Sequence, residues 1–292
     1  MPKILYGRTV RDQIALSLTE EIEKLADKPL LAILQVGNDS RSTAYIKQKK
    51  IFGEKIGARV KIFNFPESAV QSEIIAKIRS LNSDRTVHGV IIQIPLPSSL
   101  NRQEVIDTID PLKDVDGLTT SNQKFLADGQ PRLIPATARG IFELLEYYQI
   151  SVVGKRVTVM GRSALVGGPT AKLLALKGAE VKVVHTQTEK PKEVTSWADI
   201  LVVAIGKAQR VDASYLRKGQ VVVDVGVNSV SGDKLAEEIS GAKLVGDVDF
   251  KQAEGLVSAI SPVPGGVGPM TVAALFENLL MAYKMQNSVR QV

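Results

Sequence analysis

The sequence contains no cysteine among its 292 residues. Disulfide bonds and thiolate nucleophiles are therefore excluded, and cysteine usage leaves the redox compartment open. The N-terminal stretch "MPKILYGRTVRDQ" lacks the apolar core of a signal peptide. No apolar run approaches the roughly 20 residues that a membrane-spanning helix needs. These absences make a cytoplasmic enzyme or binding protein the default expectation.

Aromatic residues are scarce, at 5 %, and this bears on the meaning of the net charge of +6. Lys and Arg are spread along the whole chain, apart from one local cluster at Lys47, Lys49, Lys50 and Lys55. Surfaces that bind nucleic acid usually combine a basic stripe with stacking aromatic side chains. Because the sequence has no such stripe, we expect neither nucleic acid nor a membrane as a partner. The charge suits small anionic ligands.

Segments typical of strands and of helices alternate along the chain, which predicts an α/β protein with a largely parallel sheet. The length suits two domains of about 150 residues each. The strands expected in the first half lie at 30–37, 58–65 and 87–94, with helices at 42–56, 69–82 and 101–109. Those expected in the second half lie at 156–160, 180–185, 199–205 and 220–225. The helices expected there begin near Pro169, Pro191 and Asp212, and a last amphipathic helix runs from 269 to about 285.

A glycine-bearing turn between a strand and a helix gives the clearest nucleotide-binding signal, in "VTVMGRSALVGGPTAKLLALKG" at 157–178. Such a turn aims backbone N–H groups and a helix N-terminus at a pyrophosphate. Gly161 and Gly167 stand six residues apart, so the loop is longer than the usual G-x-G-x-x-G. A tight turn without a ligand therefore remains an alternative for this segment.

The next strand favours NADP over NAD. In NAD sites, its end usually carries an acid that binds the ribose hydroxyls. Here the strand ends in His185, Thr186 and Thr188, without an acid. Arg162 can bind a ribose phosphate with charge-assisted hydrogen bonds. For His185 alone, a solvated position at the strand end is the alternative.

Two later strands each end in a glycine-containing loop, in "ADILVVAIGKAQ" and "GQVVVDVGVN". Such loops would lie over the sheet edge where ligands bind, at the place of a nicotinamide ring. Gly206 and Gly226 are candidates there, and plain turn glycines are the alternative.

Polar residues in the first half point to a catalytic cluster. In "STAYIKQKK", Ser42, Tyr45 and Lys49 fall on one helix face, although a Tyr/Lys pair of this spacing is often a solvated surface pair. Gln93 lies near the end of the apolar strand in "GVIIQIPLP", where it either caps the strand or meets a partner. Asp116 lies in the loop "KDVDG". If they converge, burial beside the tyrosine can lower the pKa of the lysine and let it move protons.

Six motifs in this order resemble the bifunctional methylenetetrahydrofolate dehydrogenase/methenyltetrahydrofolate cyclohydrolase family over nearly the whole chain. They are "SxxYIxxK" at 42–49, "GVIIQIPLP" at 89–97, "DPLKDVDG" at 110–117, "GRSxxVGxP" at 161–169, "GDVDF" at 246–250 and "SPVPGGVGPMT" at 261–271. The resemblance implies two α/β domains with a folate-binding cleft between them. These are a three-layer catalytic domain (1–138, with the C-terminal helix 269–292 packing back) and a Rossmann-type NADP-binding domain (139–268).

The resemblance also implies the site residues. Lys49 matches the catalytic lysine, Gln93 the glutamine that hydrogen-bonds it, Tyr45 the tyrosine that stacks on the substrate, and Asp116 the acid that holds the pterin ring. The further substrate-binding positions are Ser42, Pro262, Gly265 and Gly266. The cofactor-binding positions are Gly161, Arg162, Ser163, Val166, Gly167, His185, Thr186, Thr188, Gly206 and Val227. No metal is implied.

The implied activity is oxidation of methylenetetrahydrofolate by NADP, followed by hydrolysis of the methenyl product to 10-formyltetrahydrofolate. The implied partners are tetrahydrofolate derivatives, with polyglutamylated forms among the candidates, and a second copy of the chain in a homodimer. The sequence departs from the family pattern at Ala136 and Ala138, where Cys and Pro are usual, and at Thr170, where Met is common. Thr186 stands where Ser is frequent and keeps the hydroxyl.

Two other functions are compatible with parts of this pattern. One is another two-domain NADP oxidoreductase, such as a shikimate or amino-acid dehydrogenase, in which a lysine and an aspartate also line a cleft. The lysine of those enzymes does not normally lie in "SxxYIxxK". The other is a non-enzymatic NADP sensor, which gives no reason for Tyr45, Lys49, Gln93 and Asp116 together.

Overall fold

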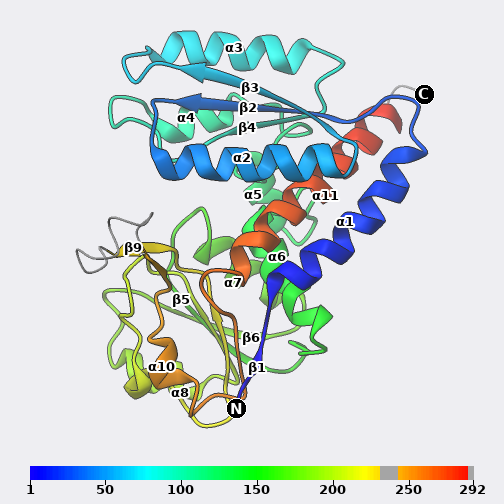
Figure 1. Ribbon diagram of the computed structural model, residues 1–292. Helices are drawn as coiled ribbons and strands as arrows, with labels where there is room; N and C mark the ends of the chain where they lie inside the picture. Colours follow the sequence, from blue (N-terminus) through cyan, green and yellow to red (C-terminus); the bar gives the residue numbers. More distant parts are fainter. Residues whose placement is uncertain (231–242, 289–292) are drawn as a thin grey trace. The chain divides into compact units, whose positions relative to one another are not determined.

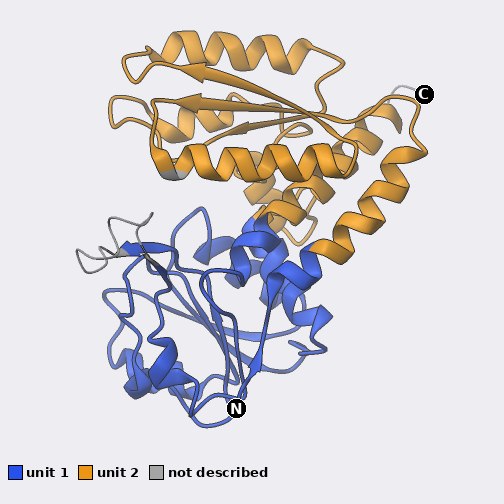
Figure 2. Ribbon diagram, viewed as in Figure 1, with its two compact units in different colours: residues 1–11, 137–271 blue, residues 12–136, 272–292 orange. Residues whose placement is uncertain are grey.

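The computed structural model describes residues 1–230 and 243–288 (Figure 1). The chain forms two compact units (Figure 2): unit 1 comprises Met1–Arg11 and Thr137–Thr271, and unit 2 comprises Asp12–Ala136 and Val272–Val292. Each unit contains a parallel sheet with helices against it, so the expected two-part α/β fold is confirmed. The division at residue 138 remains a prediction about domain organisation. Residues 289–292 of the expected C-terminal helix lie outside the described residues.

Unit 2 is built on three parallel strands in the order β3-β2-β4. They are β2 (Leu30–Val36), β3 (Arg59–Phe65) and β4 (Gly89–Ile92). The helices assigned wholly to it are α2 (Ser40–Lys55), α3 (Gln71–Ser83), α4 (Arg102–Asp107) and α5 (Thr120–Ala127). Two more helices, α1 (Gly7–Glu23) and α11 (Val267–Ser288), belong to it over most of their length.

Alternation along β2 creates the three layers of unit 2. Successive side chains of a strand point to opposite faces of the sheet. Leu31 and Ile33 join the buried cluster formed with α1, α2 and α11. Ala32 and Leu34 join a second cluster formed with α3 and α4. The sheet is therefore covered on both faces, which a parallel sheet requires.

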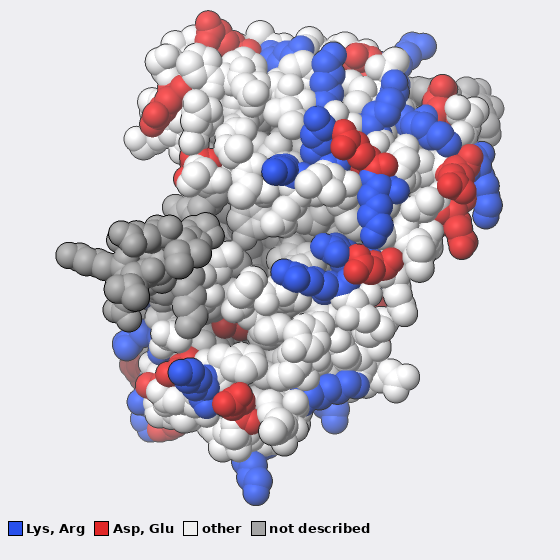
Figure 3. Space-filling model, viewed as in Figure 1, with Lys and Arg blue, Asp and Glu red and all other residues white. Residues whose placement is uncertain are grey.

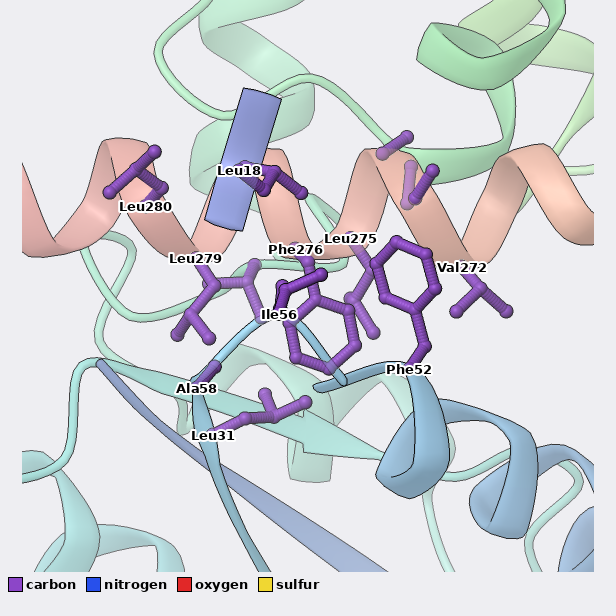
Figure 4. Close-up of a cluster of buried hydrophobic side chains, with 14 of the residues drawn as sticks. Leu18, Leu31, Phe52, Ile56, Ala58, Val272, Leu275, Phe276, Leu279 and Leu280 are labelled. Carbon is purple, nitrogen blue, oxygen red and sulfur yellow. The ribbon is translucent and has the colours of Figure 1, made fainter. Parts of the chain in front are cut away.

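The helix α11 supplies much of the first cluster (Figure 4). Phe276 is fully buried, and its ring lies 5.4 Å, between centroids, from the ring of Phe52 on α2. Burial of one such side chain contributes about 1.5–3 kcal/mol to stability. Packing of α11 against α2 thus fixes the helix that carries Lys49.

Buried polar side chains hold the loop before α5, which carries Asp116. The ammonium of Lys113 donates to the carbonyls of Leu81, Asn82 and Asp84 at 2.7–2.9 Å. On α11, the amide of Asn278 donates to the carbonyl of Val115 at 2.9 Å and to that of Ile134 at 2.7 Å. Because these carbonyls are satisfied, the loop can be buried at low cost.

Unit 1 contains a six-stranded parallel sheet in the order β1-β11-β8-β7-β5-β6. Its strands are β1 (Lys3–Ile4), β5 (Arg156–Met160), β6 (Glu180–Val184), β7 (Ile200–Val203), β8 (Val221–Asp224) and β11 (Ala259–Ile260). Beside it, β9 (Asn228–Val230) and β10 (Lys243–Val245) form an antiparallel pair. The helices are α6 (Ala136–Tyr147), α7 (Gly167–Leu176), α8 (Pro191–Trp197), α10 (Phe250–Ala253) and the short 3₁₀ turn η1 (Ala213–Tyr215).

The strand order reverses at β5, which has β6 on one side and β7 on the other. After β5 the chain passes through α7 to β6, and it then returns across β5 to β7. Such a reversal leaves a crevice at the carboxyl edge of the sheet, where ligands bind in this class of fold. The glycine-bearing turn of the sequence follows β5 and therefore opens on this crevice.

The elements expected from sequence are largely present, with informative differences. Strand β4 ends at Ile92, so Gln93 follows the strand instead of lying within it. The helix expected near Asp212 is only the three-residue turn η1. The elements that the sequence analysis did not predict are helices α1, α5, α6 and α10 and strands β1, β9, β10 and β11. Strand β1 has only two residues and pairs with the distant β11, so no local pattern marks it.

Two lysines of the basic cluster, Lys50 and Lys55, lie near acidic side chains. On α2, the Lys50 ammonium lies 3.8 Å from a Glu54 oxygen, and that of Lys55 lies 3.7 Å from an Asp12 oxygen. Lys and Arg stand among Asp and Glu on the face that Figure 3 shows. In the part of the chain that the structure describes, no helix combines the length and the apolar character needed to cross a bilayer.

We expect Asn278→Ala to lower the free energy of unfolding by about 2–4 kcal/mol, because it leaves two buried carbonyls without a donor. Urea denaturation followed by circular dichroism measures this loss. The matched control is Asn64→Ala, at an exposed position of β3, which should change stability by no more than about 0.5 kcal/mol. Equal effects of the two substitutions would contradict the role given to Asn278.

Candidate functional site

Lys49 lies on α2 with its side chain buried, at 8 % exposure. Its ammonium donates a hydrogen bond of 3.0 Å to the side-chain oxygen of Gln93. The other end of the Gln93 amide donates to the Ile94 carbonyl at 2.9 Å, and the Gln93 backbone N–H bonds the Leu34 carbonyl of β2. Both ends of the glutamine are therefore fixed, so its oxygen is held toward the lysine.

Asp116 acts on Lys49 electrostatically. Burial lowers the pKa of Lys49, and the negative charge of Asp116 acts in the opposite direction. Burial raises the pKa of Asp116, while the charge of Lys49 lowers it and that of Asp114 raises it. Desolvation dominates at both groups, since a charge in a low-dielectric environment is disfavoured. The lysine therefore releases its proton more readily than a solvated lysine does.

Ser42 and Tyr45 share the inward face of α2 with Lys49. Ser42 is buried and Tyr45 is half-buried, whereas the intervening residues 43 and 44 are exposed. The Ser42 hydroxyl donates to a carboxylate oxygen of Asp39 at 2.8 Å, and the backbone N–H of Ser42 donates to the same oxygen. Asp39 thereby caps the helix N-terminus. The structure thus gives Ser42 a part in fixing the start of the helix that presents Lys49.

The turn after β5 makes close contact with the loop after β7. Gly161 has a φ of +120°, and a Cβ there would lie 2.2 Å from the Ala204 carbonyl oxygen. Only glycine fits such an approach. Arg162 and Ser163 follow and are exposed. The backbone N–H groups of Val166 and Gly167, at the start of α7, lie 3.2 and 3.4 Å from the Ser163 hydroxyl oxygen.

The segment after β6 forms a tight turn. The Thr188 hydroxyl accepts from the His185 backbone N–H at 2.9 Å, and the Thr188 N–H donates to the His185 carbonyl at the same distance. The Gln187 N–H lies 3.2 Å from Nδ1 of His185, which makes that nitrogen an acceptor. Thr186 is exposed beside them. No acidic side chain belongs to residues 185–188, as the sequence analysis noted.

The remaining candidates also lie in unit 1. Gly206 and Val227 are exposed in the loops after β7 and β8. In the loop after β11, the Gly266 N–H bonds the Pro262 carbonyl at 2.8 Å, and the Gly265 carbonyl accepts from the Gly7 N–H at 2.9 Å. The structure therefore brings Lys49, Gln93 and Asp116 together in unit 2, with Tyr45 one turn before Lys49 on α2, and places the glycine-rich loops in unit 1.

Sequence reasoning missed two buried acids in unit 1, Asp224 and Asp247, which are 3 % and 0 % exposed. The available signal was an acid at the end of the apolar run "VVVD" and another in "GDVDF". A departure from the family pattern, Thr170, is fully buried in α7, and its hydroxyl has no partner in the structure. Among the described residues, no three His, Asp or Glu side chains are grouped so that they could hold a metal ion.

The chain matches the models of two domains of one protein family. Residues 5–116 match the family model "Tetrahydrofolate dehydrogenase/cyclohydrolase, catalytic domain". Residues 135–287 match "Tetrahydrofolate dehydrogenase/cyclohydrolase, NAD(P)-binding domain". The chain is 41 % identical to the bifunctional protein FolD of Acholeplasma laidlawii over 283 residues, covering 97 % of this chain and 99 % of that protein. It is 39 % identical to FolD 2 of Ectopseudomonas mendocina over 289 residues, covering 98 % and 93 %.

Solved structures of enzymes from the same family are similar to this chain over nearly its whole length. The bifunctional FolD enzyme of Campylobacter jejuni superposes with a TM-score of 0.92 at 34 % identity, over 98 % of this chain and 99 % of that one. The FolD structure from Trypanosoma brucei, a complex with NADP and an inhibitor, has a TM-score of 0.92 at 33 % identity, over 99 % and 100 %. Shikimate dehydrogenase of Aquifex aeolicus shares only the fold, at 13 % identity and a TM-score of 0.53 over 90 % of this chain and 94 % of that one. This chain belongs to the tetrahydrofolate dehydrogenase/cyclohydrolase family.

Proposed function

We propose that Lys49 moves the protons in the hydrolytic half of a bifunctional folate enzyme. The protein oxidises 5,10-methylenetetrahydrofolate to the methenyl compound with NADP, and it hydrolyses that product to 10-formyltetrahydrofolate. The observation that carries the proposal is the hydrogen bond of 3.0 Å from buried Lys49 to Gln93, within the electric field of Asp116.

Hydrolysis needs a group that can give and take a proton near neutral pH. Water adds to the methenyl carbon and loses one proton; one carbon–nitrogen bond then breaks as the remaining hydroxyl loses its proton to become the formyl carbonyl and the freed nitrogen gains a proton, so one proton is released overall. Burial lowers the pKa of Lys49, which brings the amine toward the range where both forms are available. Gln93 accepts from the amine and so fixes its direction without changing its charge.

Substrate binding falls to the other residues of the same face. We assign Tyr45 to stacking on the flat part of the folate and Asp116 to hydrogen bonding with the pterin ring. A ring stacked on tyrosine gains about 0.5–1.5 kcal/mol beyond the burial of its area. Pro262, Gly265 and Gly266 are assigned to the substrate from the resemblance of their loop to the family motif.

The loops of unit 1 fit the cofactor. Bound NADP supplies the hydride acceptor. The close approach of Gly161 to Ala204 lies at the strand-order reversal, where a dinucleotide binds in this class of fold. The N–H groups of Val166 and Gly167 donate to the Ser163 hydroxyl, which closes the turn before α7. Exposed Arg162 is assigned to the 2′-phosphate, and the hydroxyl groups of Thr186 and Thr188 to the adjacent ribose. These roles rest on position and chemistry.

We further infer a homodimer and a cytoplasmic location, both from the resemblance to the family. The whole assignment is tested by an absorbance assay of the purified protein with methylenetetrahydrofolate and either NADP or NAD. Appearance of the methenyl product with NADP, and its decay by hydrolysis, is the expected result. Binding of NADP without turnover would instead indicate a sensor.

We expect Lys49→Gln to lower cyclohydrolase activity by at least about 100-fold, the usual effect of losing a general acid or base. Dehydrogenase activity should fall less, because hydride transfer depends mainly on the positions of two flat rings. Both activities are measured on one preparation. The control is Lys47→Gln, an exposed lysine of the same helix, which should change neither activity by more than about twofold. Surviving hydrolysis, or equal loss of both activities, would refute the role of Lys49.

We expect cyclohydrolase activity to rise with pH along the titration of Lys49, because the neutral amine is the base. The rise should lie below the ordinary pKa of 10.5, since burial lowers the pKa of Lys49. In Asp116→Asn the rise should move to still lower pH, because the charge of Asp116 raises the pKa of Lys49. A pH–rate profile of each variant gives the result. In Lys49→Arg the rise should vanish, since a guanidinium keeps its proton.

We expect Arg162→Ala to weaken NADP binding by about 1.5–3 kcal/mol, the range for a hydrogen bond to a charged group, and to leave NAD binding nearly unchanged. Isothermal titration calorimetry with NADP and with NAD measures the two binding free energies separately. The control is Lys218→Ala, an exposed cation in the turn before β8, at the opposite edge of the sheet. An equal loss for NADP and NAD would show that Arg162 serves the pyrophosphate or the fold.

A further inference from the structure

Three successive backbone N–H groups of the loop after β7 point to one carboxylate. Ile205, Gly206 and Lys207 donate to the two oxygens of Asp247 at 2.7, 2.8 and 2.8 Å. The side-chain amide of Asn228 adds a fourth bond of 2.8 Å. Successive N–H groups that converge in this way form a concavity that binds anions, known as a nest. Here the protein fills the nest with its own side chain.

A second carboxylate, Asp224 at the end of β8, fixes the position of Asp247. One oxygen of Asp224 accepts from the backbone N–H groups of Asp247 and Gly226, each at 3.0 Å. Its other oxygen accepts from the Val248 N–H at 2.9 Å. Burial raises the pKa of Asp224 to about 7, so the charge of Asp224 changes near neutral pH. A variant of Asp247 is therefore easier to interpret than a variant of Asp224.

The sequence makes room for both acids with glycine. A Cβ at Gly226 would lie 2.2 Å from the carboxylate carbon of Asp247. A Cβ at Gly246 would lie 1.9 Å from an oxygen of Asp224. Both distances are too short for any other residue. The two acids and the two glycines thus form one built unit beneath the carboxyl edge of the sheet.

The filled nest determines which groups the loop can offer to a ligand. In a planar trans peptide, the carbonyl points opposite to the following N–H. With the N–H groups of residues 205–207 directed to Asp247, the carbonyls of Ala204, Ile205 and Gly206 point away from it. The Ala204 oxygen indeed faces Gly161 across the strand-order reversal. No hydrogen bond from the described residues reaches the Ile205 or Gly206 carbonyl.

This loop therefore cannot bind a phosphate through its amides, but it can accept hydrogen bonds. It follows β7, on the far side of β5 from β6, where the ribose phosphate is expected. A dinucleotide lies across the carboxyl edge of such a sheet, so the nicotinamide half falls at β7 and β8. The donor group of the nicotinamide ring is the N–H₂ of its carboxamide.

We propose that Asp247 is a positioning residue for the dehydrogenase reaction: by holding the amides of residues 205–207, it presents the carbonyls of Ile205 and Gly206 to the carboxamide N–H₂ of NADP. The residue touches neither the cofactor nor the substrate and acts through the loop. The proposal rests on the assignment of NADP to the loops of unit 1. The hydrolytic reaction uses no cofactor and should be independent of Asp247.

The first experiment uses Asp247→Asn, which keeps the side-chain volume and replaces one acceptor oxygen by a donor. We expect kcat/KM for NADP to fall about fivefold, mainly through KM, as for one lost neutral hydrogen bond between the loop and the cofactor. Cyclohydrolase activity of the same preparation should stay within about twofold, the scale of a substitution remote from the hydrolytic residues. A parallel loss of both activities would show a structural role and overturn the proposal.

The matched control is Asp199→Asn in the same unit. Asp199 precedes β7 at the opposite edge of the sheet and pairs there with Arg156 and Arg217, each at 2.9 Å. Loss of this acid should lower thermal stability without changing KM for NADP or the ratio of the two activities. If Asp199→Asn changes KM for NADP as much as Asp247→Asn does, destabilisation of unit 1 explains both and the proposal fails.

The second experiment needs no variant and so does not depend on folding. The wild-type enzyme is given 3-acetylpyridine adenine dinucleotide phosphate, which has a methyl ketone in place of the carboxamide and lacks its N–H₂. We expect KM for this analogue to exceed that for NADP by at least about fivefold, as for one lost neutral hydrogen bond of about 1 kcal/mol. Equal KM values, while NADP turnover itself is normal, would overturn the carboxamide contact and leave the assigned activity intact.

Discussion

The main sheet of each unit is parallel, and this constraint places the functional groups that follow its strands. In a parallel sheet, every strand reaches the same edge with its carboxyl end, and the connecting helices cover the faces. The loops that follow strands from distant parts of the sequence therefore meet at that edge. Gln93 follows β4 in unit 2, and Gly161, Gly206 and Asp224 lie at the ends of β5, β7 and β8 in unit 1.

Burial of charge is the second feature common to the two units. An unpaired buried charge is costly, so each buried ionic group here has specific partners. Lys49 has Gln93 and the field of Asp116, and Asp247 has three backbone amides. Burial lowers the pKa of Lys49, so the lysine loses its proton more readily than a solvated one. At Asp247, converging N–H groups hold the side chain in place.

Support for the catalytic loop comes from residues that take no part in the chemistry. Lys113, three residues before Asp116, donates to carbonyls at the end of α3, and Asn278 on α11 donates to those of Val115 and Ile134. Asp39 caps the helix that carries Lys49. The contacts of Lys113 and Asn278 join segments far apart in the chain, and satisfied buried polar contacts of this kind specify one arrangement of the core. The reactive groups can then be held by a rigid frame.

The sequence by itself determined the local features. Periodicity predicted most strands to within two residues and placed Ser42, Tyr45 and Lys49 on one helix face, because these patterns depend on neighbouring residues alone. The motifs predicted the family. Only the tertiary structure decided that β1 pairs with β11, that Gln93 lies just beyond its strand, and that Asp247 fills the loop after β7. Such contacts join residues far apart in the chain, and their geometry depends on how the whole sheet is assembled.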